Sequence, residues 1–207
     1  SVASFARTLD AVIDANPERI ALYNYAHLPE LFKSQSMIAD ADLPSGELKL
    51  QLFDLAVRRL GAAGYSYLGM DHFARPHDEL AVAQSRGLLR RDFQGYSSGP
   101  ESDLLGLGVS AIGAIGATYS QNHRILSDYR RSLDRNEVPI VRGIALTSDD
   151  LVRRAVIQSL MCQFAVSRNA IEAAHRIDFT RYFDAELGAL REFADAGLVS
   201  WDGDRLT

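Results

Sequence analysis

GYSYLGMDHFARPHDELAVAQSRGLLRRDFQGYSSGPESDLLGLGVSAIGAIG, residues 64–116, is the stretch that sets the character of this chain. It places histidines, carboxylates, arginines and glycines between two apolar runs, residues 65–70 and residues 104–115. Polar chemistry between apolar runs is typical of loops that carry a functional site on a rigid scaffold. We therefore expect the scaffold to surround this stretch and the site to lie within it.

Before this stretch, the chain alternates helix and strand patterns. Residues 2–13 place Phe5 and Leu9 on one apolar stripe, which predicts an amphipathic helix. Residues 19–25 are largely apolar on both faces, as in a buried parallel strand. Another amphipathic helix over residues 48–60 then leads into the apolar run at 65–70. This alternation predicts the last strand-helix units of a parallel α/β barrel, in which strand C-terminal ends carry the site.

Beyond residue 116 the pattern is mostly helical. A helix is expected over residues 122–133, and Thr147 with Asp150 forms a capping-box signature before a helix that reaches about residue 164. A further helix over 183–194 and a hairpin over 198–207 resemble a winged helix. The expected fold class is thus α/β, as an α+β fragment: the end of a barrel with its site loops over 1–116, and a helical, winged-helix-like cap over 117–207.

The composition excludes several classes of protein. The 207 residues are 47% hydrophobic and 24% charged, which is ordinary for a globular chain. A net charge of −5 gives no general attraction to nucleic acid, and no apolar run reaches the ~20 residues of a membrane span. We expect a cytoplasmic protein without nucleic-acid or membrane partners. A single cysteine, Cys162, excludes an intramolecular disulfide and is expected to be a buried, inert thiol.

Four segments, in order and at fitting spacing, carry a resemblance to a known family. They are Asn24-Tyr25-Ala26-His27-Leu28-Pro29, Gly69-Met70-Asp71-His72-Phe73-Ala74, Phe93-Gln94-Gly95-Tyr96 and Gly108-Val109-Ser110-Ala111-Ile112. Together they resemble oxygen-independent coproporphyrinogen III oxidases, radical S-adenosylmethionine enzymes of porphyrin and haem biosynthesis. The chain departs from the common family pattern His-Arg-Asn before the third segment, where it has Arg90-Arg91-Asp92.

The resemblance implies an oxidoreductase that converts coproporphyrinogen III to protoporphyrinogen IX through a 5′-deoxyadenosyl radical. It implies S-adenosylmethionine and a 4Fe-4S cluster as cofactors, and an unidentified electron donor and acceptor as partners. It places Ala26 and Ile112 against S-adenosylmethionine. Phe93 and Gln94 suit an adenine or porphyrinogen ring, because one offers a face for stacking and the other a donor and an acceptor. No catalytic residue and no metal ligand is assigned within the chain.

The cluster-binding motif of that family, Cys-x-x-x-Cys-x-x-Cys, does not occur here. An iron-sulfur cluster needs several thiolate ligands, and this chain has one cysteine. We therefore expect a fragment that corresponds to the C-terminal half of the enzyme. Such a fragment is expected to be inactive alone.

Several polar residues leave alternatives open. Arg86, Arg90 and Arg91 form either a solvated basic face or partners for substrate propionates, since guanidinium binds carboxylate through two parallel hydrogen bonds. His27 is either a hydrogen-bonded structural residue or a site residue, and Asp71 is positioned to set the tautomer of His72. The glycine-rich residues 104–112 are better interpreted as a buried strand or turn than as a dinucleotide fingerprint.

Two other functions compete with the enzyme. A related haem chaperone shares the architecture and would ligate haem through His27, His72 or His77. A DNA-binding regulator would use the winged-helix-like part, against which the net acidity counts.

Overall fold

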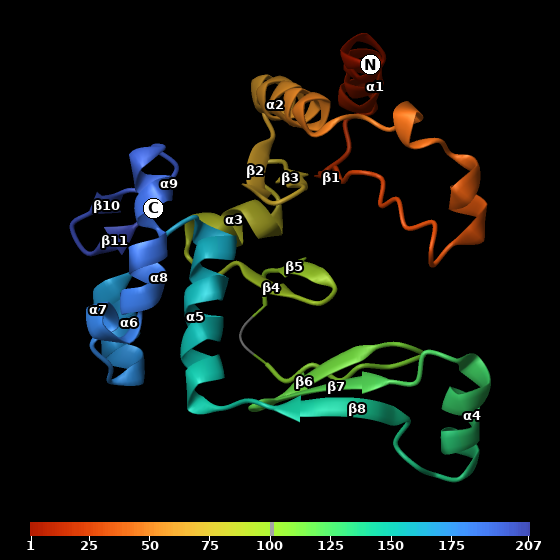
Figure 1. The fold of residues 1–207 in the computed structure, drawn as a ribbon, viewed down its shortest axis with the longest axis vertical. Helices are drawn as coiled ribbons and strands as arrows, with labels where there is room; N and C mark the ends of the chain where they lie inside the picture. The colour runs from red at the N-terminus through yellow and green to blue at the C-terminus, as the bar shows by residue number, and fades with distance from the viewer. Residues whose placement is uncertain (100–101) are drawn as a thin grey trace. The chain divides into compact units, whose positions relative to one another are not determined.

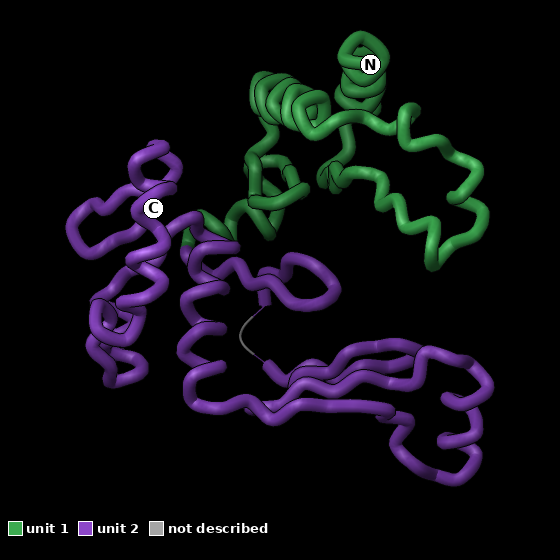
Figure 2. The backbone as a smooth tube through the Cα atoms, in the orientation of Figure 1, with its two compact units in different colours: residues 1–86 green, residues 87–207 purple. Residues whose placement is uncertain are grey.

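A computed structural model describes residues 1–99 and 102–207 of the chain. These residues form two compact units, Ser1–Arg86 and Gly87–Thr207 (Figure 2). Among the described residues, none of the helices combines the length and the apolar character that a membrane crossing requires.

The first unit packs two long helices beside a small sheet (Figure 1). The Ser1 side chain caps the first helix, and the Ser45 side chain caps the second by accepting from the amide of Leu48. Leu9 and Leu60 pack with Phe73 of the sheet in one buried cluster. The elements are α1 (Val2–Ala15), β1 (Arg19–Ala21), η1 (Lys33–Met37), η2 (Asp40–Asp42), α2 (Gly46–Ala62), β2 (Ser66–Gly69), β3 (His72–Ala74) and α3 (Glu79–Ser85).

The strand predicted over residues 19–25 is shorter than expected and pairs differently. β1 covers Arg19–Ala21 and lies antiparallel to β3, in a sheet of order β1-β3-β2. The amide of Leu22 still donates to the Asp71 carbonyl at 2.7 Å, and the chain then leaves the sheet. The prediction of a buried parallel strand was therefore wrong for these residues, because their partner strand is the return arm of the β2–β3 hairpin.

The second unit begins with a hairpin and a larger sheet. β4 (Arg90–Asp92) pairs with β5 (Gly95–Ser97), and β6 (Ile112–Ile115), β7 (Thr118–Asn122) and β8 (Ile140–Ala145) form an antiparallel sheet. α4 (Leu126–Asp134) lies between β7 and β8 in the chain, at one end of this sheet (Figure 1). The helix predicted over 122–133 thus begins four residues late, because residues 118–122 are the central strand of the sheet.

The C-terminal part of this unit is helical, with a short hairpin. α5 (Ser148–Gln163) begins at a Thr147 capping box, as predicted. Its remaining elements are β9 (Val166–Ser167), α6 (Arg168–His175), α7 (Phe179–Tyr182), α8 (Asp184–Ala189), α9 (Arg191–Asp195), β10 (Trp201–Asp202) and β11 (Arg205–Leu206). The predicted terminal hairpin is confirmed as β10–β11, whereas the single helix predicted over 183–194 is divided between α8 and α9.

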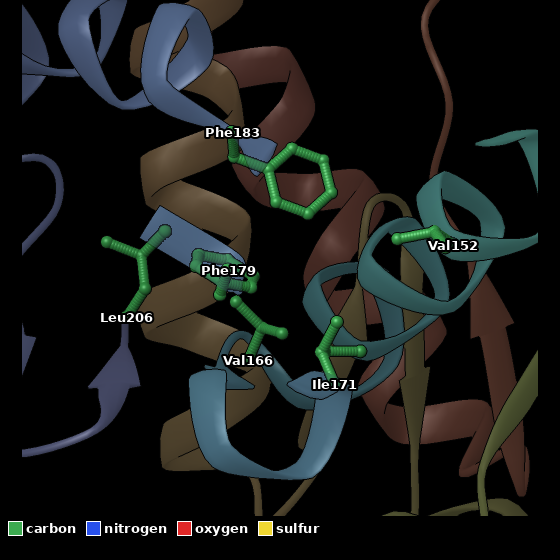
Figure 3. Packing of buried hydrophobic residues seen from close by; sticks show 6 residues of the cluster. All are labelled: Val152, Val166, Ile171, Phe179, Phe183 and Leu206. Carbon is green, nitrogen blue, oxygen red and sulfur yellow. The ribbon is translucent and has the colours of Figure 1, made fainter. Parts of the chain in front are cut away.

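One apolar cluster holds this helical part together (Figure 3). Val152 of α5, Phe179 of α7 and Leu206 of β11 contribute buried side chains to it. Mixed helix and sheet content with a helical, hairpin-bearing C-terminal part is the fold class that the sequence predicts. No closed barrel occurs among the described residues. The division at residue 116 into two domains stays a prediction.

Candidate functional site

Phe93 and Gln94 form the tip of the β4–β5 hairpin. The register pairs Asp92 with Gly95, so these two residues are the whole turn. The Asp92 carboxylate accepts from the backbone amide of Gln94 at 2.8 Å, and Gly95 adopts a φ of 128°. That positive φ favours glycine, which has no Cβ to clash. The turn geometry therefore fixes the two adjacent side chains at an exposed tip.

The Phe93 ring is open to solvent on much of its surface. Its exposed fraction is 59%, and its edge-to-face contact with Tyr119 of β7 has a centroid distance of 5.4 Å. Such a contact orients an aromatic ring while leaving one face free. An exposed, oriented ring next to the Gln94 amide can stack on a flat heterocycle and hydrogen-bond its edge.

Ile112 begins β6 and is half-buried, opposite Gln121 of β7. Alternate residues of a strand share a face, so Ile112 lies on the same face of β6 as Ala114. Ala114 lines a cleft together with Phe93. The second unit thus holds three of the four predicted cofactor residues, two on one hairpin tip and the third on the neighbouring sheet.

The glycine-rich stretch before Ile112 is a clamped loop, which confirms close backbone approach in place of a dinucleotide fingerprint. A Cβ on Gly106 would lie 2.9 Å from the Ile112 carbonyl carbon, and one on Gly113 would lie 3.1 Å from the Leu104 carbonyl oxygen. The buried Asn122 amide donates to the carbonyls of Gly106 and Gly108, each at 2.9 Å. These bonds fix the backbone that leads into Ile112.

The cleft itself has a volume of about 670 Å³ and lies within the second unit. α5 lines one side of it, with Arg153, Ile157 and Gln158, and the β4–β5 hairpin contributes Arg90 and Arg91. Of the three arginines that the sequence singled out, these two line the cleft. Arg86 is the C-terminal cap of α3 in the first unit.

Ala26 lies in the first unit, in the irregular segment after β1. It is exposed, and its carbonyl accepts from the side-chain amide of Gln35 at 3.2 Å. The carbonyl oxygen of the same side chain accepts from the backbone amide of Leu28 at 2.5 Å. Gln35 therefore bridges both sides of His27 and fixes this segment. The Nδ1 atom of His27 is buried and has no hydrogen-bond partner among the described residues.

Asp71 and His72 lie at the turn between β2 and β3. The Asp71 carboxylate is 2.7 Å from Nδ1 of the His72 ring. An ionised carboxylate at this distance favours the tautomer with hydrogen on Nδ1 and leaves Nε2 as an acceptor. The contact between Asp71 and His72 that the sequence suggested is thus formed. Burial and the Asp71 charge also raise the pKa of the neighbouring Tyr67 hydroxyl.

No cluster of thiolates is available in the described chain. Cys162 is buried in α5, as predicted, and its burial raises the pKa of the thiol. A neutral, buried thiol is a poor ligand and a poor nucleophile. No group of three or more metal-ligating side chains occurs among the described residues. The described residues therefore do not fit a 4Fe-4S cluster, although they fit a flat, apolar-faced ligand at the hairpin tip.

Sequence reasoning missed the residues that support this site. Tyr119 and Asn122 lie in a strand that the sequence did not predict, and Arg153 with Gln158 lies on α5, more than fifty residues after the hairpin. No local pattern marks Asn122 as a buried hydrogen-bonding residue, because its partners, Gly106 and Gly108, lie more than ten residues earlier in the chain.

Comparison with known proteins shows which family and which enzymes this chain is similar to. Residues 146–207 match the HemN C-terminal domain family. The oxygen-independent coproporphyrinogen III oxidase of Pseudomonas aeruginosa is 51% identical over 199 residues, which are 96% of this chain and 43% of that protein. The corresponding protein of Thermostichus vulcanus is 42% identical over 207 residues, which are all of this chain and 64% of that protein.

A solved structure shows the same fold. The structure of coproporphyrinogen III oxidase (HemN) from Escherichia coli, described as a radical SAM enzyme, has a TM-score of 0.94 and 46% identity. The match covers 100% of this chain and 48% of that protein. The chain therefore spans less than half the length of most of these relatives. The resemblance predicted from the four segments is confirmed: this chain is similar to a C-terminal part of oxygen-independent coproporphyrinogen III oxidases.

Proposed function

We propose that this chain is the C-terminal part of an enzyme that oxidatively decarboxylates coproporphyrinogen III to protoporphyrinogen IX without oxygen. The observation that carries the proposal is similarity along the whole chain to one protein, the Escherichia coli oxidase, in sequence and in fold. Fold alone would be a weak argument for activity. Identity of 46% in the same alignment, with the segments around Ala26, Phe93 and Ile112 present, is a stronger one.

The proposal needs S-adenosylmethionine and a 4Fe-4S cluster, which supply the hydrogen-abstracting radical when they are bound. The ligands of the cluster would come from residues outside this chain, because the described residues offer one buried thiol. S-adenosylmethionine has a flat adenine, and the second unit offers a matching surface in Phe93 and Gln94. An electron donor and an electron acceptor complete the set of partners.

In this proposal the residues of the chain position the cofactor and exclude water. The Phe93 ring stacks on the adenine, and the Gln94 amide binds its polar edge. Ile112 supplies an apolar wall within the second unit, and Ala26 keeps the role that the family resemblance implies for it. A dry, fixed environment is needed because a primary carbon radical attacks any group within reach.

Anaerobic turnover of the full-length protein tests the proposal. The protein that contains this chain would be purified and reconstituted without oxygen, and coproporphyrinogen III, S-adenosylmethionine and a reductant would be supplied. We expect release of carbon dioxide and formation of protoporphyrinogen IX. The isolated 207-residue chain is expected to show neither product. A reconstituted protein with a bound cluster that cleaves S-adenosylmethionine but leaves coproporphyrinogen III intact would contradict the proposed substrate.

Stable haem binding would support the competing chaperone function. The spectrum of a haem titration distinguishes the two, since axial histidine ligation gives a defined Soret shift. We expect no such shift from the wild-type protein, because the whole chain matches the oxidase in sequence and in fold.

A further inference from the structure

The cleft beside the hairpin carries an excess of positive charge. Four arginines and two aspartates are among its lining residues. The carboxylate of one of them, Asp150, belongs to the Thr147 capping box and accepts hydrogen bonds from the backbone amide and the hydroxyl of Thr147. A cleft lined by one sign of charge concentrates ligands of the opposite sign. The ligand expected here is therefore an anion.

Arg91 is the arginine that the fold holds most firmly. Its backbone amide donates to the side-chain carbonyl oxygen of Gln158 at 3.1 Å, and its carbonyl accepts from the amide nitrogen of the same side chain. Its guanidinium lies 4.8 Å from the centre of the Tyr96 ring, whose hydroxyl donates to the Met161 carbonyl at 3.0 Å. α5 thus fixes both the backbone of Arg91 and the ring beneath its side chain.

The guanidinium of Arg91 is left incompletely satisfied. Its Nη1 atom is buried and makes no hydrogen bond to any of the residues that the structure describes. A buried nitrogen of a charged group without an acceptor is unfavourable, and such groups in native proteins have a reason. Binding of a carboxylate across the guanidinium fork is one such reason, since two parallel bonds satisfy a guanidinium edge.

Arg153 has a different role. It donates to Asp149 at 2.8 Å and to Glu186 at 2.6 Å, which links α5 to α8. These two carboxylates already neutralise it, so it is not the principal anion-binding group. Arg91, which has a buried unpaired nitrogen, is therefore a better donor to an anion than Arg153, which is paired with two acids.

The same cleft has a large apolar side. Phe93, Tyr119, Leu104, Ile157 and Met161 are among its lining residues. An inorganic anion would gain nothing from these side chains. A ligand with a broad ring and peripheral carboxylates would contact both the apolar side and the arginine. The cleft therefore fits an amphiphilic polycarboxylate better than a small ion.

We infer that this cleft is the substrate propionate site, and that Arg91 binds a propionate carboxylate while Tyr119 and Ile157 contact the tetrapyrrole. The inference rests on the proposed function for the identity of the tetrapyrrole. It assigns one of the arginines that the sequence left undecided, and it explains why Arg91 is anchored to α5. In this assignment Arg91 is a substrate-binding residue that orients one carboxylate and takes no part in the radical step.

The test is equilibrium binding of coproporphyrin III, the stable oxidised form of the tetrapyrrole, to the full-length protein. Fluorescence quenching would be measured for the wild type, Arg91→Met and Arg91→Lys. A charged hydrogen-bonded pair in a partly buried cleft corresponds to about tenfold or more in affinity. We expect Arg91→Met to bind at least tenfold more weakly. Arg91→Lys keeps the charge without the planar fork, and we expect an intermediate loss.

Two controls make the result specific. Arg130→Met removes the same charge from the exposed face of α4, outside the cleft, and should leave the affinity within twofold of the wild type. The tetramethyl ester of coproporphyrin III lacks carboxylates, so its affinity should not respond to substitution of Arg91. Equal coproporphyrin affinity in the wild type and in both Arg91 variants would overturn the inference. Should Arg91→Met fail to fold, unchanged affinity of Arg91→Lys for coproporphyrin would overturn it alone.

The binding test and the turnover test fail independently. A wild-type protein that produces protoporphyrinogen IX, with Arg91 variants unchanged in KM and in coproporphyrin affinity, would remove the inference and keep the proposed function. A protein without turnover, whose coproporphyrin affinity still falls tenfold in Arg91→Met, would keep the carboxylate site and remove the proposed oxidase activity.

Discussion

Replacement of Asn122 by alanine should loosen the loop that leads into Ile112. The Asn122 side chain is 5% exposed, and its amide nitrogen donates to the carbonyls of Gly106 and Gly108 at 2.9 Å each. A neutral hydrogen bond contributes a net ~0.5–1.5 kcal/mol, so the loss of two corresponds to about 2 kcal/mol. The substitution also leaves two carbonyls without the donor that now satisfies them.

Hydrogen exchange in the full-length protein measures this loss locally. The amide of Ser110 donates to the His123 carbonyl at 2.8 Å, and the amide of Ala114 donates to the Leu104 carbonyl at 2.8 Å. Because ~1.4 kcal/mol is a factor of ten, a loss of about 2 kcal/mol should accelerate exchange of these amides about thirtyfold. Thr118→Ala on the same strand removes one exposed hydroxyl and should change the local stability by less than ~0.5 kcal/mol.

Unchanged protection of the Ser110 and Ala114 amides in Asn122→Ala would refute the reasoning. It would mean that the glycine backbone alone fixes the loop. A general loss of protection across both units would mean instead that Asn122 supports more of the fold than the loop next to Ile112. The expected result lies between these two, with faster exchange confined to residues 104–114 and the adjoining sheet.

Three further predictions concern the C-terminal part. Thr147→Ala removes the hydroxyl that forms one half of the capping box, and should lower the free energy of unfolding by ~0.5–2 kcal/mol in denaturant unfolding. Phe179→Ala empties the centre of the cluster in Figure 3 and should cost ~3–5 kcal/mol, seen as a large fall in Tm. Hydrogen bonds from Tyr182 and Arg153 lower the pKa of Asp149 in the folded protein. The stabilisation of the fold by these bonds is therefore complete above the pKa of ~3.9 that the aspartate has in the unfolded chain, and it is lost as the pH falls through the lower pKa of the folded state. In Tyr182→Phe the acid dependence of Tm in this range should become shallower, and an identical acid profile in both proteins would contradict the assignment.

The parts of the fold that depend on local chemistry could be predicted from the sequence. The capping box at Thr147 needs only residues three positions apart, and α5 begins where it indicates. The positive φ of Gly64 after α2 likewise depends only on neighbouring residues. The four segments that carry the family resemblance are local patterns too, and the comparisons confirm them.

The parts that depend on pairing between distant residues could not be predicted. The sequence of β8, Ile-Val-Arg-Gly-Ile-Ala, does not alternate apolar and polar residues, so no period-two pattern marks it as a strand. Residues 19–25 are apolar enough to predict a buried parallel strand, yet the strand they form, β1, pairs antiparallel with β3. The same limit applies to the site: Arg91 meets Gln158 across sixty-seven residues, and only the fold brings them together.

The central claim is that the tip of the β4–β5 hairpin binds S-adenosylmethionine, and cofactor affinity tests it most directly. The affinity would be measured anaerobically in the reconstituted full-length protein for the wild type, Phe93→Ala and Phe193→Ala. Phe193 is a matched control, because it is 50% exposed on α9 and lies outside the cleft. Stacking of a base on an aromatic ring contributes ~1–3 kcal/mol, so Phe93→Ala should weaken binding about fivefold or more while Phe193→Ala has no effect. Equal affinity of all three proteins for S-adenosylmethionine would contradict the account.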